Sequence, residues 1–380
     1  MYITLELFDK NNIDSLVWPD TEEGCYAKKF LEPLIKNGIH YYVDNIQADI
    51  FALKVQQFVF PTTVVTENYK NSWVCSPYSQ YITYGKEAIE HFGNPFLVKL
   101  AKLFLGGFDK MGCKGSIDSV VCVNNWLFST DLYPEGFSSE QISAIVTALK
   151  ERFPRHAIVF RSLNPVVNGS LMHSLKNLGF HFITSRQILL TDTKNESIFC
   201  TRILKSDLKL WRESSYKVLD ETQISADECS KLLELYNSLY ITHHSYVNPQ
   251  INNSFMRLIS KQSLLNFKVL RLNGSIKGVA GYCVRNGVLY SPFFGYEKDD
   301  PDHNVIYRLL NTALILEAQK EKLIFHQSSG ASFAKKIRRA ESCLESMAIY
   351  TSHLPLKQRL TWAAFRTLIN WFGPLYMKKY

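Results

Sequence analysis

The strongest constraint on the fold is a regular alternation of strand and helix patterns between Phe267 and Leu354. Two Asn-Gly pairs, at 273–274 and 286–287, separate short segments rich in apolar residues. An Asn-Gly pair favours a tight hairpin, because both central residues of such a turn need positive φ angles. The spacing therefore predicts three consecutive strands joined by hairpins, over residues 267–272, 275–285 and 288–294.

Helices and strands then alternate twice more. Apolar residues recur every three or four positions over 304–320, which is the period of an amphipathic helix. A short apolar strand is predicted over 323–326, and it leads into the small-residue loop Gln327-Ser328-Ser329-Gly330. A basic helix over 331–340 and a closing strand over 344–350 complete the pattern.

This order, three strands followed by helix, strand, helix and strand, resembles the fold of the Gcn5-related N-acyltransferases (GNAT). The segment SSGASFAKKIRRAESCLESMAIYTSHLP, residues 328–355, is similar to GNAT-like acyltransferases related to the Fem-type peptidyltransferases. In those proteins a small Gly-containing loop, a Phe-Lys basic helix and a closing strand recur. The resemblance implies a GNAT-like fold and an acyl transfer reaction, and it leaves the substrate open.

A similar order of elements is predicted in the first half of the chain. A strand over 120–129, with Asn124-Asn125 inside it, is followed by a helix that begins at Ser138 or Ser139. A strand over 156–160, a helix over 170–178 that ends at Gly179, and a strand over 182–191 come next. We therefore predict an internal duplication of one fold.

The predicted fold class is α/β with mixed sheets, in two GNAT-like domains arranged in tandem. The domains are expected over residues 1–195 and 205–354, joined by a polar linker near Asp192 to Asp207. A separate amphipathic helix is expected over 355–380. Pro61 is expected to interrupt the strands near the N-terminus, because proline cannot donate to a central ladder.

The composition is that of an ordinary globular protein. The 380 residues are 46% hydrophobic and 21% charged, and a net charge of +8 permits an anionic partner without requiring one. Eight cysteines without a C-x-x-C pair argue against a zinc site and against a disulfide scaffold. The N-terminal segment has acids where a signal peptide has bases, and the chain has no run of 18 apolar residues, so a cytoplasmic protein is expected.

Acyl transfer to an amine needs donors that bind the carbonyl oxygen and a route for the amine proton. The resemblance implies that two parallel strands splay apart and that the pantetheine of an acyl-CoA pairs with the exposed edge in the gap. In the second half these strands are 288–294 and 323–326, and in the first half they are 120–129 and 156–160. Acyl-CoA is therefore the expected co-substrate, and the expected acceptor is an amine of a small metabolite, a lipid or an envelope precursor.

The usual GNAT diphosphate loop is missing from this chain. Its place before the second-half helix is taken by Glu297-Lys298-Asp299-Asp300-Pro301-Asp302-His303-Asn304, an acidic segment that repels a diphosphate. The first half offers only Pro134-Glu135-Gly136-Phe137-Ser138-Ser139 at the corresponding place. Two alternatives therefore stay open: an aminoacyl-tRNA-dependent transferase of Fem type, and a non-catalytic binding protein with a degenerate fold.

The candidate catalytic residues lie at the splayed strands of the second half, whose motif is the more complete. They are His326 at the end of its strand, Tyr290 on the neighbouring strand and Ser329 in the loop. An imidazole titrates near neutrality, so His326 is a candidate base. The alternative is a strand-end histidine whose partner is the backbone.

The candidate substrate-binding residues are spread over both halves. In the second half they are His243, His244, Ser245, Asn248, Tyr307, Lys335 and Arg338, and in the first half they are Arg161 and Asn164. The resemblance places Lys335 beside the donor channel, and the alternative is a solvated basic helix face. No metal site is expected near the two histidines, because no carboxylate or cysteine stands at a useful spacing.

The tail over 355–380 combines aromatic and basic residues and contains no acid. Trp362, Phe365 and Ile369 fall at three- and four-residue spacings, as in a helix face that packs on a protein core. The same composition fits a helix that lies on an anionic membrane. We expect docking onto the protein, and peripheral membrane contact stays the alternative.

Overall fold

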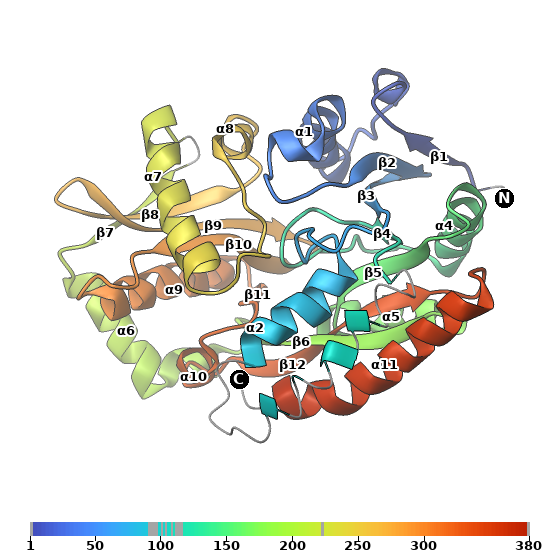
Figure 1. Cartoon of the computed structure of the whole chain (residues 1–380). Helices are drawn as coiled ribbons and strands as arrows, with labels where there is room; N and C mark the ends of the chain where they lie inside the picture. The colour runs from blue at the N-terminus through green and yellow to red at the C-terminus, as the bar shows by residue number, and fades with distance from the viewer. Residues whose placement is uncertain are drawn as a thin grey trace. The chain divides into compact units, whose positions relative to one another are not determined.

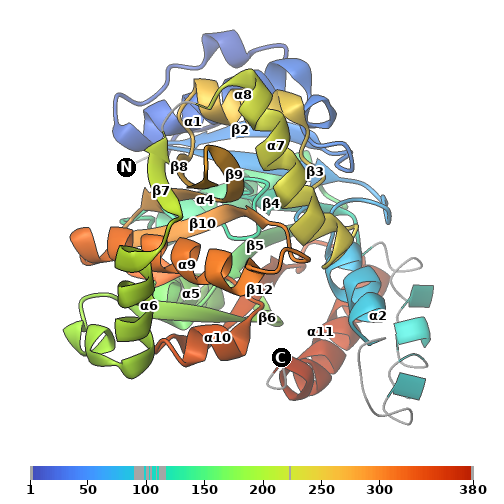
Figure 2. The ribbon, with the colours of Figure 1, turned by 90° about the vertical axis from the view of Figure 1, so that its left-hand side faces the viewer.

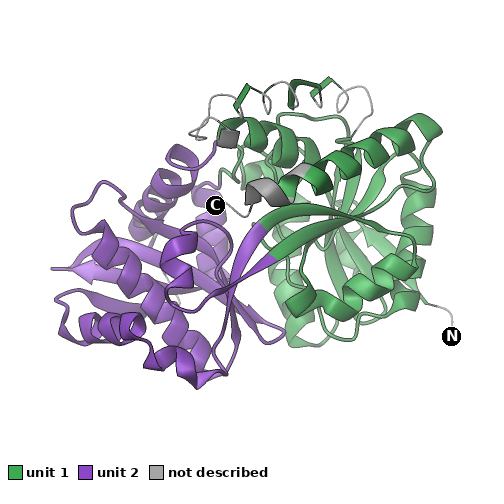
Figure 3. Ribbon diagram, turned by 90° about the horizontal axis from the view of Figure 1, so that it is seen from below, with its two compact units in different colours: residues 1–186, 247–250, 344–379 green, residues 187–246, 251–343, 380 purple. Residues whose placement is uncertain are grey.

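The structure is a computed structural model that describes residues 3–89, 98–99, 102, 105–107, 109–110, 117–221 and 224–377 (Figure 1). The chain forms two compact units (Figure 3). Unit 1 comprises Met1–Arg186, Val247–Gln250 and Leu344–Lys379, and unit 2 comprises Gln187–Tyr246, Ile251–Cys343 and Tyr380. The sequence-based boundaries assume one continuous stretch per domain, whereas both units are built from separate stretches.

Unit 1 contains a mixed sheet with the strand order β1-β2-β3-β4-β5-β12. Its strands are β1 (Leu5–Phe8), β2 (Asp49–Val55), β3 (Phe58–Val65), β4 (Val120–Val123), β5 (Ala157–Leu163) and β12 (Glu341–Tyr350). The strands β4 and β5 are parallel, and the other neighbours are antiparallel. The parallel pair is the element that the GNAT resemblance requires.

The helices of unit 1 cover both faces of this sheet (Figure 1). They are α1 (Glu22–Asn37), α2 (Tyr84–Ile89), α4 (Ser139–Arg152), α5 (Pro165–Asn177) and α11 (Leu356–Met377), with short turns at Ile13–Ser15, Ile39–Tyr41 and Ser79–Thr83. The apolar faces of α4 and α5 pack on β2 to β5 in one core cluster. As predicted, Ser138 caps α4, in a capping box with Gln141, and Gly179 follows α5 with φ +87°.

Unit 2 contains strands in the order β6-β11-β10-β9-β8-β7. Its strands are β6 (His181–Asp192, which begins in unit 1), β7 (Lys217–Glu221), β8 (Asn266–Leu272), β9 (Ser275–Arg285), β10 (Val288–Tyr296) and β11 (Ile324–His326). Both predicted hairpins are confirmed, because Asn273, Gly274, Asn286 and Gly287 have φ angles of 50°, 82°, 51° and 71°.

The helices of unit 2 lie on the two faces of β8 to β10 (Figure 2). They are α6 (Arg202–Glu213), α7 (Ala226–Asn237), α8 (Asn253–Lys261), α9 (His303–Lys320) and α10 (Ser332–Lys336), with short turns at Glu196–Cys200 and Ser238–Thr242. Leu270 and Tyr282 belong to the core cluster that packs against α9. Phe293 faces the other way and stacks on Tyr236 of α7, with ring centroids 5.0 Å apart.

The last strand of each predicted repeat pairs with a strand of the other repeat. β6 ends the first run of elements and pairs antiparallel with β11 in unit 2. β12 ends the second run and pairs antiparallel with β5 in unit 1. This exchange explains why both units are discontinuous in sequence.

Two local predictions in unit 1 are wrong. Pro61 lies inside β3, opposite Ala52 of β2. The Pro61 carbonyl accepts from Asn125 N on the β4 side of the strand. The N–H that proline lacks would point to the same side. No ladder bond is lost there, because the β3–β4 pairing ends at Thr62. The strand predicted over 120–129 ends at Val123, because Asn124 has φ +61°.

The predicted linker over 192–207 is also wrong in its second part. Thr201 caps α6, which begins at Arg202. Its side chains Leu204 and Asp207 are buried in unit 2. The predicted basic helix over 331–340 is shorter than expected, since α10 spans only Ser332–Lys336 and Arg339 has φ +66°.

Candidate active site

The parallel strands β10 and β11 of unit 2 pair over only three residues. The register joins Val288 to Ile324, Leu289 to Phe325 and Tyr290 to His326. Beyond this point β10 bulges between Tyr290 and Phe293. Pro292 lies within the bulge and has no N–H to give to either neighbour. Two of the three predicted catalytic residues, Tyr290 and His326, are therefore paired where the strands part.

The His326 side chain is buried, with 1% of its surface exposed. Its Nδ1 accepts a hydrogen bond from the Ser328 backbone N at 3.2 Å. A neutral imidazole with an accepting Nδ1 carries its proton on Nε2, so the ring presents an N–H donor there. Tyr290, also buried, meets the ring edge-on, with centroids 5.5 Å apart and an interplanar angle of 83°.

The loop after His326 is held by a buried ammonium group. Ser328, Gly330 and Ala331 have φ angles of 57°, 78° and 46°, which turn the chain tightly. Lys335 Nζ donates to the carbonyls of Gln327 and Ser329 at 2.6 and 2.9 Å. Lys335 is thus not on a solvated helix face, and the Ser329 residue is exposed.

A chain of buried amides connects this loop to α9. Gln327 Nε2 donates to Thr191 Oγ1 at 2.7 Å, and Asn311 Nδ2 donates to Gln327 Oε1 at 3.2 Å. Asn311 Oδ1 is buried and has no hydrogen-bond partner among the described residues. Tyr307, one turn earlier, likewise has a buried hydroxyl without a partner in the described part of the chain. Buried polar atoms are normally paired, so these two atoms are exceptions.

Burial raises the pKa of Tyr307 to about 12, with smaller effects from Arg338, which lowers it, and from Tyr296 and Asp207, which raise it. Its hydroxyl is therefore protonated near neutral pH and is a donor. Arg338 is buried and donates from Nε to Asp207 Oδ2 at 2.6 Å. Arg308 Nε donates to Asp207 Oδ1 at 2.6 Å, so one carboxylate joins α9 to the turn that follows α10.

Asp207 is the residue of this cluster that sequence reasoning missed. A signal was present, because Thr201 stands before Leu204, Leu208 and Trp211, which follow the helical period. The polar residues around it were instead interpreted as a linker. The residue that orients Arg338 was therefore overlooked.

The four predicted residues before Pro249 do not share one environment. His243 and His244 are exposed on unit 2 after α7, whereas Ser245 is buried and its N donates to Tyr240 O at 3.0 Å. The surrounding protein atoms and the positive charges of Lys298, His243 and Lys335 lower the pKa of His244. Asn248 belongs to unit 1, where its Oδ1 accepts from Trp73 Nε1 at 2.8 Å.

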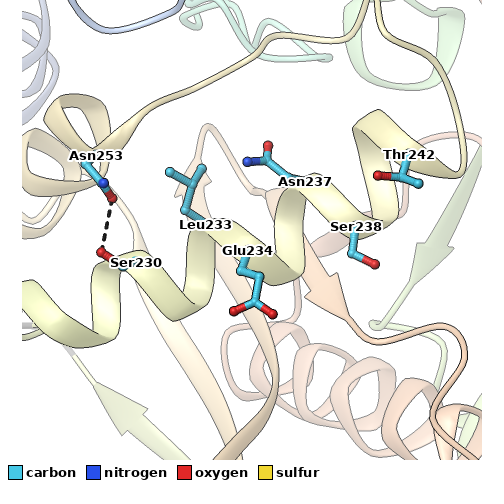
Figure 4. Close-up of a pocket in the computed structure, with 7 residues that line it drawn as sticks. All are labelled: Ser230, Leu233, Glu234, Asn237, Ser238, Thr242 and Asn253. Atoms are coloured by element: carbon cyan, nitrogen blue, oxygen red, sulfur yellow. Dashed lines mark hydrogen bonds between the residues drawn. The ribbon is translucent and has the colours of Figure 1, made fainter.

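An open cavity of about 490 Å³ lies along α7 and the start of α8 in unit 2 (Figure 4). Its lining is mostly polar: Ser230, Leu233, Glu234, Asn237, Ser238, Thr242 and Asn253. Ser230 Oγ donates to Asn253 Oδ1 at 3.4 Å and joins the two helices at one end. Thr242 lies at the other end, directly before His243 and His244.

The corresponding parallel strands of unit 1 part after Val123 and Phe160. The chain turns at Asn124, and the Asn125 side chain is buried at the parting. Asn125 Nδ2 donates to Thr63 Oγ1 at 2.8 Å and to Val74 O at 3.0 Å. Its Oδ1 accepts from Leu127 N at 3.1 Å and from the Arg161 guanidinium at 3.2 Å. This amide uses all its hydrogen-bonding capacity within the protein.

Arg161 completes the buried network of unit 1. Its Nη1 donates to Asp131 Oδ2 at 3.0 Å, and its guanidinium lies 5.2 Å from the Trp73 ring centroid. Burial raises the pKa of Asp131 to about 6, against the opposing effect of Arg161. Asn164 is the N-cap of α5, accepting from Val167 N at 3.0 Å. Both predicted residues thus have protein partners.

The N-terminus of α9, where a diphosphate would bind, is surrounded by carboxylates. Asp302 Oδ2 accepts from Tyr216 Oη at 2.8 Å, and Asp300 forms an ion pair with Lys277 at 3.3 Å. Asp302 N donates to Asp300 Oδ1 at 2.9 Å. The helix end is therefore already bound to negative charge.

Among the described residues, no group of three or more histidine, cysteine or acidic side chains is placed to hold a metal ion. In the same part of the chain, no helix combines the length and apolarity needed to span a membrane.

No family model matches this sequence, and no curated protein matches it. Among solved structures, FemX is similar to 95% of this chain and 99% of its own, with a TM-score of 0.50 and 9% identity. A tandem GNAT protein from the clavulanic acid biosynthesis pathway is similar over 92% of this chain and 98% of its own (TM-score 0.39, 9% identity). The C-terminal domain of a putative lysylphosphatidylglycerol synthetase from Agrobacterium fabrum covers 66% of this chain and 82% of its own (TM-score 0.47, 11% identity).

At these identities the likeness concerns the fold. FemX matches nearly the whole chain, and the parallel strand pair occurs once in each unit. The chain therefore has the tandem GNAT-like fold that the sequence predicted, with mixed sheets and a C-terminal helix.

Proposed function

We propose that this protein is an acyltransferase that binds the acyl carbonyl in unit 2, where β10 and β11 part. One observation carries the proposal. Buried polar atoms of Asn311 and Tyr307 on α9 lack a described partner, and the gap of unit 1, unlike that of unit 2, is filled by the Asn125 amide, whose polar atoms are all bonded. A ligand that supplies their missing partners gains interactions that cost no reorganisation of the protein.

In this proposal His326 is a hydrogen-bond donor to the carbonyl oxygen. The amine nitrogen attacks the carbonyl carbon and negative charge builds on the oxygen. The bond to the leaving oxygen or sulfur then breaks, and the proton that the amine loses passes to the leaving group as the amide forms. Because Nδ1 accepts from Ser328 N, the proposed donor to that charge is the Nε2–H of His326. Tyr290 fixes the ring from its edge, and Lys335 fixes the loop that carries Ser328 and Ser329.

We propose an aminoacyl ester, such as an aminoacyl-tRNA, as the donor. The carboxylates of Asp300 and Asp302 at the N-terminus of α9 disfavour a diphosphate there, and therefore disfavour coenzyme A. Acyl-CoA is the second candidate, supported by the edge of β10 beyond Tyr290, which has no strand partner on the β11 side among the described residues. A pantetheine amide would add to such an edge as a short strand.

We propose the cavity along α7 as the approach for the acceptor, a small-molecule or lipid amine. It ends at Thr242, directly before His243 and His244. Glu234 is the only carboxylate in its described lining, and an ammonium group would be attracted to it.

The experiment uses labelled aminoacyl-tRNA and labelled acetyl-CoA as donors, each with a panel of amines that includes amino acids, amino sugars and phosphatidylethanolamine. We expect label to move from the aminoacyl-tRNA to an amine. Transfer from acetyl-CoA alone would replace the first donor by the second. A folded protein that transfers label from neither donor would contradict the proposed function.

The role of His326 is tested by two substitutions. His326→Phe removes the donor and should lower transfer roughly 10²- to 10³-fold. His326→Gln keeps an N–H and should retain clearly more activity than His326→Phe. Equal losses in both variants would favour a role of His326 as a general base.

A further inference from the structure

The C-terminal helix α11 binds unit 1 through one face. Trp362 and Phe365 are 1% and 0% exposed. Asn370 adds two hydrogen bonds to the edge of β6, donating from Nδ2 to Phe182 O at 2.8 Å and accepting from Thr184 N at 2.9 Å. The docking that we expected for this tail is therefore present, and it uses one side of the helix only.

The opposite side of α11 is exposed and apolar. Leu356, Leu360 and Trp371 are 66%, 61% and 68% exposed. At 100° per residue these three positions fall within one 60° sector, which also contains the exposed Thr367. Trp362 and Phe365 lie on the far side of the helical wheel. A helix with two apolar faces, only one of them buried, has a second surface to cover.

Basic side chains flank this exposed sector. Arg359 and Arg366 lie on one side of it and Lys357 on the other, by the same helical period. The segment from Pro355 to Met377 contains no aspartate or glutamate. None of the three basic residues forms an ion pair with a carboxylate in the described part of the chain. Their charge is therefore not neutralised by the described part of the protein.

A cavity of about 180 Å³ lies between α11 and the end of β12, within unit 1. Its lining combines the two arginines with hydroxyl and apolar groups: His181, Ile349, Thr351, Ser352, Leu356, Arg359, Leu360, Trp362, Ala363 and Arg366. Burial and the positive charge of Arg366 lower the pKa of His181. Two guanidinium groups and two hydroxyl groups beside exposed leucines suit an anionic head group attached to an acyl chain.

We propose that the exposed face of α11 binds the surface of an anionic phospholipid bilayer. Leu356, Leu360 and Trp371 enter the interface between head groups and acyl chains, while Arg359 and Arg366 contact lipid phosphates. Charge decides between this occupant and a second copy of the chain. Two copies would bring basic, acid-free surfaces together, whereas an anionic bilayer complements them. The inference does not depend on the proposed reaction.

The test is sedimentation of the full chain with vesicles of phosphatidylglycerol and phosphatidylcholine, and with phosphatidylcholine vesicles alone. We expect binding to the anionic vesicles, at least tenfold weaker binding to the neutral ones, and weakening by added salt. Arg359→Gln and Arg366→Gln should each weaken binding roughly fivefold. The combined variant Leu356→Ser, Leu360→Ser, Trp371→Ser should lose it.

The matched control is Val17→Ser, which changes an apolar residue that is 75% exposed elsewhere on unit 1. It should bind vesicles like the unchanged protein, and all variants should keep the unchanged melting temperature. Absence of binding to anionic vesicles, or binding that the triple variant retains, would overturn the proposal. So would a dimer that the triple variant abolishes. Full displacement from vesicles by millimolar inorganic phosphate at constant ionic strength would assign the cavity to a free anion instead.

Discussion

Each unit contains one pair of parallel strands that part, and the two partings are filled differently. In unit 1 the gap beyond β4 and β5 holds Asn125, whose amide is bonded to Thr63, Val74, Leu127 and Arg161. In unit 2 the gap beyond β10 and β11 is bordered by the side chains of Tyr290 and His326, and polar atoms beside it lack described partners. The gap is therefore filled by a fully bonded amide in unit 1 and bordered by Tyr290 and His326 in unit 2, although Arg161 Nε and Ser162 Oγ of unit 1 also lack described partners.

This difference separates a structural polar network from a candidate site. A fully bonded buried side chain such as Asn125 specifies and rigidifies a core, whereas the gap of unit 2 is bordered by two residues that the proposed reaction uses. Non-glycine residues at positive φ occur beside both partings, at Ser328 and Ala331 in unit 2 and at Asn124, Leu127 and Ser162 in unit 1. We therefore expect substitutions in unit 1 to change stability and those in unit 2 to change activity.

The largest effect is expected from Arg161→Met in unit 1. It leaves Asp131 as a buried carboxylate without its cation, which should cost roughly 3–5 kcal/mol of unfolding free energy at neutral pH. The cost should shrink as the pH is lowered, because the pKa of Asp131 is already raised to about 6 and the carboxyl becomes neutral. Urea denaturation, with hydrogen exchange followed by peptide to assign the loss to unit 1, measures it.

The matched change in unit 2 is Arg338→Met. Asp207 keeps the second arginine, Arg308, so the expected loss of stability is smaller, about 1–2 kcal/mol. Transfer per folded molecule should fall in this variant and stay unchanged in Arg161→Met. The reverse pattern would place the working site in unit 1.

Local sequence signals predicted most of the elements correctly, because each depends on neighbours in the chain. The hairpins at Asn273-Gly274 and Asn286-Gly287, the cap at Ser138 and the end of α5 at Gly179 are of this kind. The exchange of β6 and β12 was not predictable, because a closing strand carries the same pattern whichever sheet it joins. Pro61 shows the same limit. Its place in β3 depends on where β4 turns away, more than fifty residues later.

The candidate site was predictable in part. His326 and Tyr290 were predicted because each lies on one of the two strands that were expected to splay apart. The structure pairs them in register. Asp207 and Asn311 were missed, because a polar residue on a helix looks the same in the sequence whether it is buried or exposed. Their burial depends on distant partners, Arg338 and Gln327. The group from His243 to Asn248 was predicted as one site, yet its members belong to two units.

A pH effect of intermediate size is expected from Asp118 at the start of β4. Burial raises the pKa of Asp118 to about 7 from its ordinary 3.8, against hydrogen bonds from Ser76 Oγ and Tyr78 N. The folded state therefore holds this proton more tightly than the unfolded state. The stability that the proton contributes is fully present below about pH 3.8 and is lost as the pH rises through 7.

Asp118→Asn removes this titration from the core of unit 1. The difference in unfolding free energy, unchanged protein minus variant, should fall by on the order of 1–4 kcal/mol between pH 4 and pH 8. Denaturation curves at several pH values measure it. A difference that stays constant with pH would show that the carboxyl is not protonated in the fold.

A smaller loss of stability, about 2 kcal/mol, is expected from Lys335→Met, which removes two charged hydrogen bonds from the loop after His326. Transfer should fall at least tenfold, because the loop no longer fixes Ser328 beside the imidazole. Lys336→Met is the control, since Lys336 is exposed on the same helix and should change neither quantity. Loss of stability without loss of transfer would make Lys335 purely structural.

The smallest change in stability is expected from Tyr307→Phe. Its hydroxyl is buried, protonated near neutral pH and without a described partner, so removing it breaks no hydrogen bond and should alter unfolding by less than about 0.5 kcal/mol. Tyr216→Phe is the contrast, because it loses the bond to Asp302 at 2.8 Å and should cost about 1 kcal/mol. If the Tyr307 hydroxyl binds a ligand, its variant should still lose roughly tenfold in transfer. A loss of stability as large as that of Tyr216→Phe would show that the hydroxyl is already bonded inside the protein, and the argument for a ligand beside Tyr307 would fail.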